Sequence, residues 1–599
     1  MMGERVAARE RVRASRDGGD SQMRGFHSTE AGRAGRTPAA LRSWMLAAVL
    51  VGAALASLPP SGCGGSSPGG STPSEALPKG YFDVEVRDAD SNELIPAKIS
   101  VFDANEDSAA IIPGNSEGDL LRIKLNEIYL GRGTGRIHLY DGQWDLYFSH
   151  GIEYTVFKKH LDITYPVGTQ KITLKRAVDT TGYLSADFHI HARPSFESSL
   201  QPGGLPTLED RVITYLAEGV EIMGSSDHQC IVDYSSTIAQ LGVADRIGSL
   251  VGVEATPPIT SYPSGDGNCS DYRFVPPPLF TEPGHWNAFP LDPGQSYDTT
   301  SDKGVNAATL YDRLRKLGAQ GGDTPLIQLN HPFYELGFIN IGWLQRRDYR
   351  FGAPVPFSNP LAPNAFLTEK STEAGSKTRS IDFDAMELWS GGSYVYGIPA
   401  RNAWFEFLNQ GLLKVGTSNS DSHNTKITAG FPRNFVRLGT DDPSRATPRQ
   451  VAAAVRSGKV VGTTGPFIRV LAGSAEPGDL VAAPSGSITL RVNVQAAPWV
   501  PVEEIRIYAN GTLARQIAVG KSEKSVRFDK NVTLDLARDA SIVIEAGSAI
   551  PADPTQEPPE PEIYRHVTTG TNGFRPIGFT NPLFVDVDGN GSFDPPGLS

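Results

Sequence analysis

The chain has few cysteines, an excess of acidic over basic side chains, and no obvious transmembrane-length apolar run. Its 599 residues include 3 cysteines, and 55 lysines and arginines stand against 67 acidic residues, for a net charge of −12. This acidic balance argues against a surface that binds the phosphates of nucleic acids. Only Cys230 and Cys269 lie beyond the N-terminal region, and the sequence leaves open whether they pair.

The apolar run Met45–Ala56 is too short to span a bilayer comfortably, but it has the length of a signal-peptide core. It leads to Leu58-Pro-Pro-Ser-Gly-Cys63, which resembles a bacterial lipoprotein cleavage box with Pro60 in place of the usual aliphatic residue. We therefore expect residues 1–63 to be an N-terminal extension with an export signal. Cys63 would be lipidated and would anchor the protein to the membrane in the bacterial cell envelope. Secretion, or a soluble periplasmic form, is the alternative.

The spacing of apolar residues divides the remaining chain into a linker and three domains. Residues 64–79 are rich in Gly, Ser and Pro and predict a flexible linker. Period-two alternation in 80–177 and 475–599 predicts two β-sandwiches, the first similar to carboxypeptidase-regulatory-like modules. Residues 178–470 mix short apolar strands with helical segments and so predict an α/β domain. Polar motifs follow its strands, which is how (β/α) barrels build their sites.

Six of the eleven histidines lie in five polar motifs of this α/β domain. The motifs are Ala186-Asp-Phe-His-Ile-His191, Ser226-Asp-His228, Gly284-His-Trp286, Leu329-Asn-His-Pro332 and Ser420-Asp-Ser-His423, with Glu254 among them in Gly252-Val-Glu-Ala-Thr256. Histidine and carboxylate are ligands of divalent metals, and this supply exceeds one mononuclear site. His189 and His191 alternate on a predicted strand, which puts both imidazoles on one face.

Other chemistries find no support in the sequence. There is no G-x-S-x-G nucleophile elbow, P-loop or dinucleotide fingerprint. Each motif could instead have a purely structural role as a polar residue at a strand end, such as a capping Asp227 beside a surface His228. The number of motifs in one domain favours a metal site instead.

The order His-x-His, Asp-His, Glu, Gly-His, Asn-His-Pro and Asp-x-His is similar to the PHP (polymerase and histidinol phosphatase) superfamily. The phrases around Glu254, His285 and His423 resemble its CehA/McbA-like metallohydrolase branch, and the resemblance covers about 180–470. It implies a distorted (β/α)7 barrel with a site for up to three metals. The ligands it implies are His189, His191, His228, Glu254, His285, His331, Asp421 and His423, with Glu197 where Asp is more usual.

The resemblance also implies a mechanism in which two or three divalent ions activate a water molecule. Glu254 would bridge metals, and Asp421 would bind metal and accept a proton. Asp187 and Asp227 would hold imidazoles in the right tautomer. The ligand types do not choose between zinc, manganese and iron.

The leading hypothesis is a metal-dependent hydrolase of a small anionic substrate, with phosphoesterase activity as the default. Arg193 and Arg433 would bind the anion, or would instead form structural salt bridges. Carbamate, amide or ester hydrolysis of the CehA/McbA type is one alternative, and a non-catalytic surface binding protein is another. The amidohydrolase superfamily also begins with His-x-His but normally needs a carboxylated lysine, and no lysine occurs between Lys175 and Lys303.

The C-terminal tail resembles the start of a calcium-binding loop. Oxygen donors occur at Asp586, Asp588, Asn590 and Asp594, and Gly597 stands where the acid that completes such a loop is expected. Calcium binding and an ordinary Asp/Gly turn both remain open.

Overall fold

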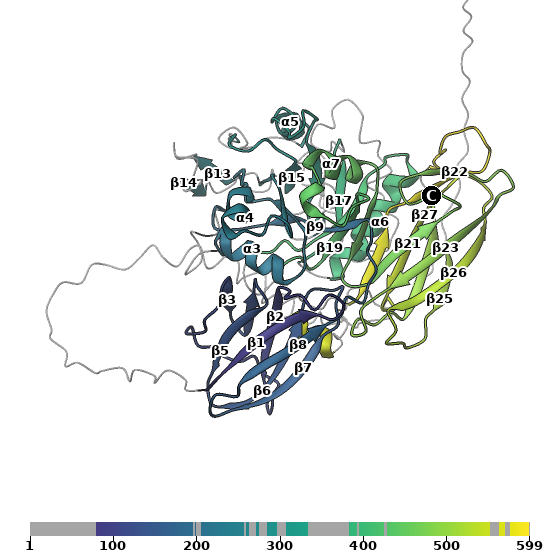
Figure 1. Ribbon diagram of the computed structural model, residues 1–599. Helices are drawn as coiled ribbons and strands as arrows, with labels where there is room; N and C mark the ends of the chain where they lie inside the picture. The colour runs from purple at the N-terminus through teal and green to yellow at the C-terminus, as the bar shows by residue number, and fades with distance from the viewer. Residues whose placement is uncertain are drawn as a thin grey trace, which may run out of the picture. The chain divides into compact units, whose positions relative to one another are not determined.

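The computed structural model describes residues 80–195, 198, 205–256, 259–262, 271–274, 284–295, 297, 307–333, 382–391, 394–423, 428–550, 562–568 and 575–597 (Figure 1). They all belong to one compact unit, Ala76–Ser599. The expected export segment 1–63, the linker 64–79, Glu197 and Cys269 lie outside the described residues. Among the helices that are described, none combines the length and apolarity needed to cross a membrane. The protein is multidomain and mostly β, with several sheets of which one is large and mixed.

The N-terminal strands form two sheets around a shared core. The order in one sheet is β5 (Thr134–Leu139), β1 (Gly80–Asp88) and β8 (Thr169–Leu174). The other contains β3 (Leu121–Lys124), β4 (Glu127–Leu130), β2 (Ala97–Asp103), β6 (Gly142–Ser149) and β7 (Phe157–Ile163). Alternate residues of β1 are buried, so Phe82, Val84 and Val86 face Ile99 and Val101 of β2 in one hydrophobic core.

The α/β region holds its strands in two sheets. In the first, β9 (Tyr183–Ile190), β10 (Ile222–Ser225) and β11 (Gly248–Leu250) are parallel. On the other side of β9, β19 (Arg433–Arg437) pairs antiparallel with β9, and β20 (Val460–Thr463) pairs antiparallel with β19. The second runs β12 (Val253–Ala255), β15 (Trp286–Phe289), β16 (Leu326–Leu329), β17 (Ala385–Ser390) and β18 (Val415–Asn419), with the last three parallel. A separate hairpin joins β13 (Ile259–Tyr262) to β14 (Asp271–Phe274). Closure of these strands into a seven-stranded barrel stays a prediction.

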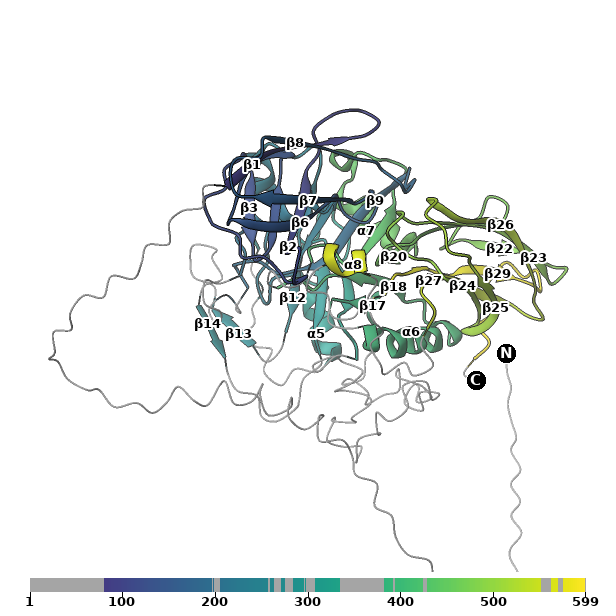
Figure 2. The ribbon, with the colours of Figure 1, turned by 90° about the horizontal axis from the view of Figure 1, so that it is seen from below.

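Helices connect the strands of this region. They are α3 (Leu208–Ala217) and α4 (Ser235–Leu241), labelled in Figure 1, and α5 (Ala307–Leu314), α6 (Tyr394–Asn409) and α7 (Pro448–Arg456), labelled in Figure 2 as well. Helix α3 begins at a capping box, in which Thr207 and Asp210 satisfy each other's backbone N–H groups. This fixed start matters because α3 carries an arginine that reaches the functional site.

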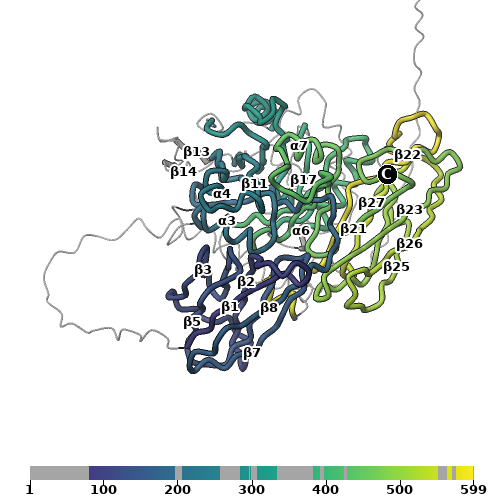
Figure 3. Tube along the Cα trace, in the orientation of Figure 1, coloured from purple at the N-terminus to yellow at the C-terminus, as the bar shows by residue number. Residues whose placement is uncertain are grey.

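The C-terminal strands extend the first of these sheets. Strand β28 (Ile577–Thr580) pairs with β20 and with β27 (Ala540–Gly547), and the sheet continues through β24 (Glu504–Ala509) to β25 (Thr512–Ala518). Short strands β22 (Leu480–Ala482) and β29 (Leu583–Asp586) join it, and helix α8 (Glu562–Val567) precedes β28. Strands β21 (Phe467–Leu471), β23 (Ser487–Gln495) and β26 (Val526–Asp535) form their own sheet. Backbone pairing therefore runs across the expected domain boundary at 470–475. Figure 3 traces the chain through the green to yellow-green C-terminal strands, among them β21, β23, β26 and β27.

Candidate metal centre

Eight of the nine side chains expected to ligate metal come together in one cluster, which we call the histidine cluster. It forms four groups of three residues, and within each group the ligand atoms lie within 4.8 Å of one another. The groups are His191, His228 and His423; His189, Glu254 and His331; His189, His191 and Asp421; and His228, Glu254 and His285. These buried His/Glu groups could hold one or more metal ions.

The cluster forms because strand ends and their following turns meet there. His189 is on β9, Glu254 is on β12, and His285 immediately precedes β15. The remaining histidines and Asp421 follow the ends of their strands within a few residues. A parallel bridge joins His228 to Glu254, and another joins Ile190 to Ser422, so backbone pairing holds the ligand turns together.

Glu254 is the centre of the cluster, and its two oxygens face different imidazoles. Its Oε1 lies 3.2 Å from Nδ1 of His285 and 3.5 Å from Nε2 of His189. Its Oε2 lies 2.9 Å from Nδ1 of His228 and 3.4 Å from Nε2 of His191. A carboxylate placed in this way can serve two cations at once.

Asp421 closes the cluster on its more open side. Its Oδ1 lies 3.2 Å from Nε2 of His189 and 3.3 Å from Nε2 of His191. Its side chain is 16% exposed, whereas Glu254 is completely buried. Its φ of 50° is in the left-handed region, which non-glycine residues seldom adopt.

Several ligand atoms of the cluster lie close to one another but are buried without a hydrogen bond of normal geometry among the described residues. They are Nε2 of His189 and His191, both ring nitrogens of His285, Oε2 of Glu254 and Oδ1 of Asp421. A buried polar atom left in this way costs about 1–3 kcal/mol. Convergent lone pairs that are buried together are what divalent metals require, so the donor set fits a metal centre.

Charge within the cluster shifts its pKa values in opposite directions. Burial alone would raise the pKa of Glu254, but the neighbouring His228, His189 and His285 hold it well below its usual range. Burial alone would lower the pKa of His189, yet the negative charges of Asp421, Glu387 and Glu254 raise it well above. Positive charge is therefore favoured at the positions that metals would share.

Two other histidines stay neutral near pH 7. Burial is the main cause that lowers the pKa of His285 to about 4. Burial, together with the nearby His423 and His228, holds the pKa of His191 well below its usual range. Neutral imidazole is the form that binds metal.

Glu387 on β17 belongs to the site, although the sequence motifs do not include it. Its Oε1 lies 2.8 Å from Nδ1 of His189, and its Oε2 accepts the backbone N–H of His331 at 2.7 Å. Asn419 donates to Oε1 at 2.9 Å. An acid inside the apolar segment Ala385-Met-Glu-Leu-Trp389 is the signal that could have revealed it, because a buried carboxylate needs partners.

Arg211 on α3 is a second residue that the motifs do not include. Its Nε donates to the carbonyl of His191 at 2.6 Å, and its Nη2 donates to the carbonyls of Ser422 and His423 at 2.6 and 2.8 Å. One buried guanidinium thus ties together the two turns that carry His191 and His423. Periodicity assigns Arg211 only to a helix, so its partners were not predictable.

Asp187 contacts backbone and hydroxyl groups around the ligand turns, and its expected role as an orienter of imidazoles stays a prediction. Its Oδ1 accepts the backbone N–H groups of His189 and Ser420 at 3.1 and 3.2 Å, and its Oδ2 accepts the hydroxyl of Tyr215 at 2.8 Å. Asp187 therefore fixes the backbone of the ligand turns. Asp227 likewise accepts a backbone N–H, that of Ala192, at 2.6 Å.

Of the two arginines expected to hold substrate, Arg433 is buried and bonded to the backbone. It is 1% exposed, and it donates to the carbonyls of Gly430 at 2.6 Å and Glu218 at 2.8 Å. Its substrate-binding role stays a prediction. Arg193 is exposed just beyond β9, and its role stays a prediction.

Cys230 and the C-terminal acids complete the predicted features. Cys230 is disulfide-bonded, and its partner lies outside the described residues.

In the tail, the carboxylates of Asp539, Asp588 and Asp594 approach within 4.8 Å of one another, while Asp586 accepts the N–H groups of Gly589 and Gly591. Calcium binding there stays a prediction.

Comparison with protein-family models gives no match, and no curated protein is significantly similar to this sequence. The geometry and chemistry of the histidine cluster therefore carry the functional conclusion.

Proposed function

We propose that this protein is a metal-dependent hydrolase of the PHP type, related to the CehA/McbA-like branch, and that it cleaves phosphate esters. The observation that carries the proposal is the set of eight converging ligands, five of which (His189, His191, Glu254, His285 and Asp421) bury a ligand atom that has no hydrogen-bond partner of normal geometry among the described residues. Divalent ions held there would supply an activated water molecule and a Lewis acid. The proposal includes closure of the central strands into a (β/α)7 barrel.

The charge of the cluster favours an anionic substrate. With metal bound, the six imidazoles are neutral and the two carboxylates contribute −2, so two divalent ions leave +2 and three leave +4. Counting Glu387 lowers each sum by one and leaves it positive. A buried positive site attracts a phosphate more strongly than a neutral carbamate or amide.

The chain's own residues then take distinct roles. Glu254, buried at the centre, would bridge two ions and fix their separation. Asp421 and His423 are the more exposed members, at 16% and 23%, so substrate would approach on their side. There Asp421 would also accept a proton from the attacking water. Glu387 would hold Nδ1–H of His189 and so leave its Nε2 free for metal.

The proposed cellular setting is the bacterial envelope, with lipidated Cys63 as the anchor. It rests on the sequence of residues 1–63 alone. An extracytoplasmic phosphoesterase would act on small phosphate esters outside the cell membrane.

The test is metal analysis of the purified protein, combined with turnover of an aryl phosphate and an aryl carbamate. We expect at least two metals per chain, phosphate turnover, and loss of both in His191→Ala. His160→Ala is the matched control, since this histidine is 55% exposed and lies outside the cluster. Fewer than two metals per chain, or full activity in His191→Ala, would contradict the proposal. Carbamate turnover without phosphate turnover would favour the CehA/McbA-type alternative.

A further inference from the structure

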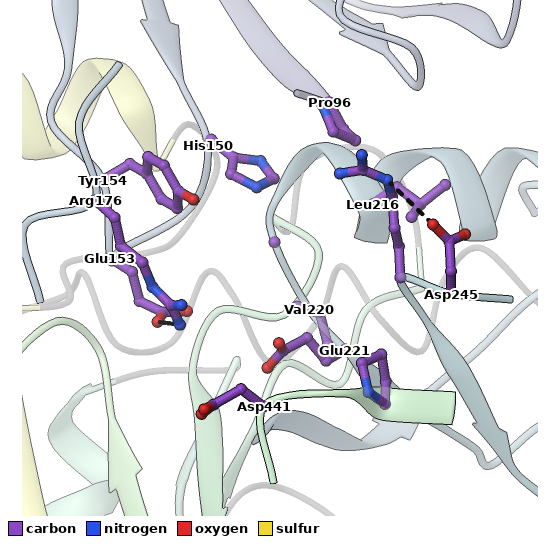
Figure 4. Close-up of a pocket in the computed structure, with 13 residues that line it drawn as sticks. Pro96, His150, Glu153, Tyr154, Arg176, Leu216, Val220, Glu221, Asp245 and Asp441 are labelled. Carbon is purple, nitrogen blue, oxygen red and sulfur yellow. Dashed lines mark hydrogen bonds and ion pairs between the residues drawn. The ribbon is translucent and has the colours of Figure 1, made fainter. Parts of the chain in front are cut away.

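A polar cavity of about 180 Å³ lies near the start of β10, whereas the histidine cluster takes its ligand from beyond the end of that strand. Its walls come from six places in the sequence: Pro96 before β2, the turn after β6, Arg176 after β8, the end of α3 with its connection to β10, the loop between α4 and β11, and the loop after β19 (Figure 4). About 150 Å³ is enough to admit a molecule of benzene size. The cavity is therefore large enough for a small organic ligand.

The lining carries more negative than positive charge. Its four carboxylates stand against two guanidinium groups. Arg176 is occupied by Glu153, to which it donates at 2.7 Å. Among the described residues, Glu221 and Asp441 have no salt bridge to either arginine.

Glu221 is the most enclosed of these unmatched acids. Its Oε2 accepts the N–H and the hydroxyl of Ser185, at 2.7 and 3.1 Å. Burial, reinforced by the neighbouring carboxylate of Glu153, raises its pKa to about 7. Near pH 7 this carboxyl is therefore about half ionised, and a cation in the cavity would favour its charged form.

His150 adds a hydrogen-bond acceptor to the same wall. Its Nδ1 lies 3.1 Å from the carbonyl oxygen of Ala217, so Nδ1 carries the proton and donates. Burial lowers the pKa of His150 to about 4, so the ring is neutral and its Nε2 keeps a lone pair. Figure 4 shows the imidazole of His150 on one side of the cavity and the carboxylate of Glu221 on the other.

We propose that this cavity binds a small organic cation that carries N–H groups, such as a diamine. Surplus negative charge, a carboxylate and an imidazole lone pair all call for a donor with positive charge. A single divalent metal suits the cavity less well. Among the described residues, no group of three ligand atoms within 4.8 Å includes any member of the cavity wall. Acceptors spread over a cavity match a molecule with separated ammonium groups.

The test is isothermal titration calorimetry of the purified protein with 1,4-diaminobutane in the presence of EDTA. We expect saturable binding of the diamine and none of 1,4-butanediol or succinate, which have similar length but no positive charge. Glu221→Gln should weaken diamine binding about tenfold or more, because it removes a charge-assisted hydrogen bond. With EDTA present, the result does not depend on the metal centre.

Asp441→Asn provides a second variant, because this exposed acid can be changed with less risk to folding. It should also weaken the diamine, by a smaller factor. Asp162→Asn, an exposed acid on β7 outside the cavity, is the matched control and should bind as the unmodified protein does. The absence of saturable diamine binding, preferential binding of succinate, or unchanged affinity in both cavity variants would overturn the proposal.

Discussion

Three glutamates among the described residues are completely buried, and the surroundings of two of them, Glu254 and Glu545, differ in kind. Glu254 lies among imidazoles in the histidine cluster. Glu545, on β27, accepts hydrogen bonds from Arg401 of α6 at 3.0 Å and from Arg506 of β24 at 3.1 Å. Burial would raise the pKa of both carboxyl groups, and in both cases the cationic neighbours keep the pKa low instead.

The difference lies in whether the compensating charge is permanent. Arginine keeps its charge at every accessible pH and donates directional hydrogen bonds, so the Glu545 group is complete within the protein. Imidazole loses its charge near neutral pH and then presents lone pairs, so the Glu254 group is complete only with added cations. A buried acid among arginines therefore indicates structure, and a buried acid among histidines indicates a metal site.

The largest expected effect is on activity, in Glu254→Gln. An amide cannot bridge two cations, so we expect hydrolase turnover to fall by more than about 1,000-fold and metal content to fall with it. In EDTA the free energy of unfolding should change much less than in a Glu545 variant. Kinetics on an aryl phosphate and urea denaturation measure the two quantities. Retained turnover would remove Glu254 from the metal centre.

The second effect is on stability, in Glu545→Gln. This change leaves Arg401 buried without its carboxylate, and breaking a buried pair in this way costs about 3–5 kcal/mol. Urea denaturation in EDTA should show that loss. The folded fraction of the variant should keep its metal, because Glu545 lies outside the four ligand groups. Equal stability losses in the two glutamate variants would break the distinction between permanent and exchangeable charge.

A smaller effect, on metal affinity, is expected in Glu387→Gln, and it sharpens the comparison within the metal site. Glu387 touches one imidazole of the cluster and would not contact metal itself, and loss of such partners typically weakens metal binding 10- to 100-fold. Titration with Zn²⁺ against a competing chelator measures the affinity. Glu387→Asp keeps the charge and should recover part of it. A loss as large as that of Glu254→Gln would indicate that Glu387 is itself a ligand.

Sequence reasoning found the ligands because metal chemistry restricts residue type. Only a few side chains can bind divalent ions, so histidines and acids at strand ends stand out, and eight of the nine expected ligands lie in the histidine cluster. The polar groups around them were harder to assign. Asp187 and Arg433 lie close to the motifs in sequence, yet they bind backbone atoms, and only the fold decides which atoms meet.

Prediction of the fold from the sequence meets the same limit. Period-two alternation predicts that β1 and β23 are strands, and each buries alternate residues. Alternation does not state which strands pair, however. The pairing of β28 with β20 joins residues 461–463 to 578–580, and nothing local to either segment indicates it. Long-range pairing of this kind explains why the large mixed sheet crosses a boundary drawn from the spacing of apolar residues.

The smallest expected effect concerns His150, a histidine kept neutral by burial. Its folded-state pKa of about 4 lies below the ordinary value of 6.5, so the unfolded chain binds more protons between these values. The free energy of unfolding should therefore decrease as the pH falls from 6.5 toward 4, by at most about 1.4 kcal/mol per pH unit. Glu545 has a lowered pKa, so its contribution is lost only at lower pH, below the ordinary glutamate value of 4.5.

His150→Gln should flatten this dependence, and His160→Gln, changed at an exposed histidine, should leave it unaltered. Urea denaturation in EDTA at several values between pH 7.5 and 4.5 measures both. Because the histidine cluster is present in all three proteins, its own titration cancels in the comparison. If His150→Gln retained the full slope, folding would not lower the pKa of His150, and the ring would become charged as the pH falls below about 6.5. In that range its Nε2 would be a donor, and the wall of the cavity would lose the acceptor that favours a cationic ligand.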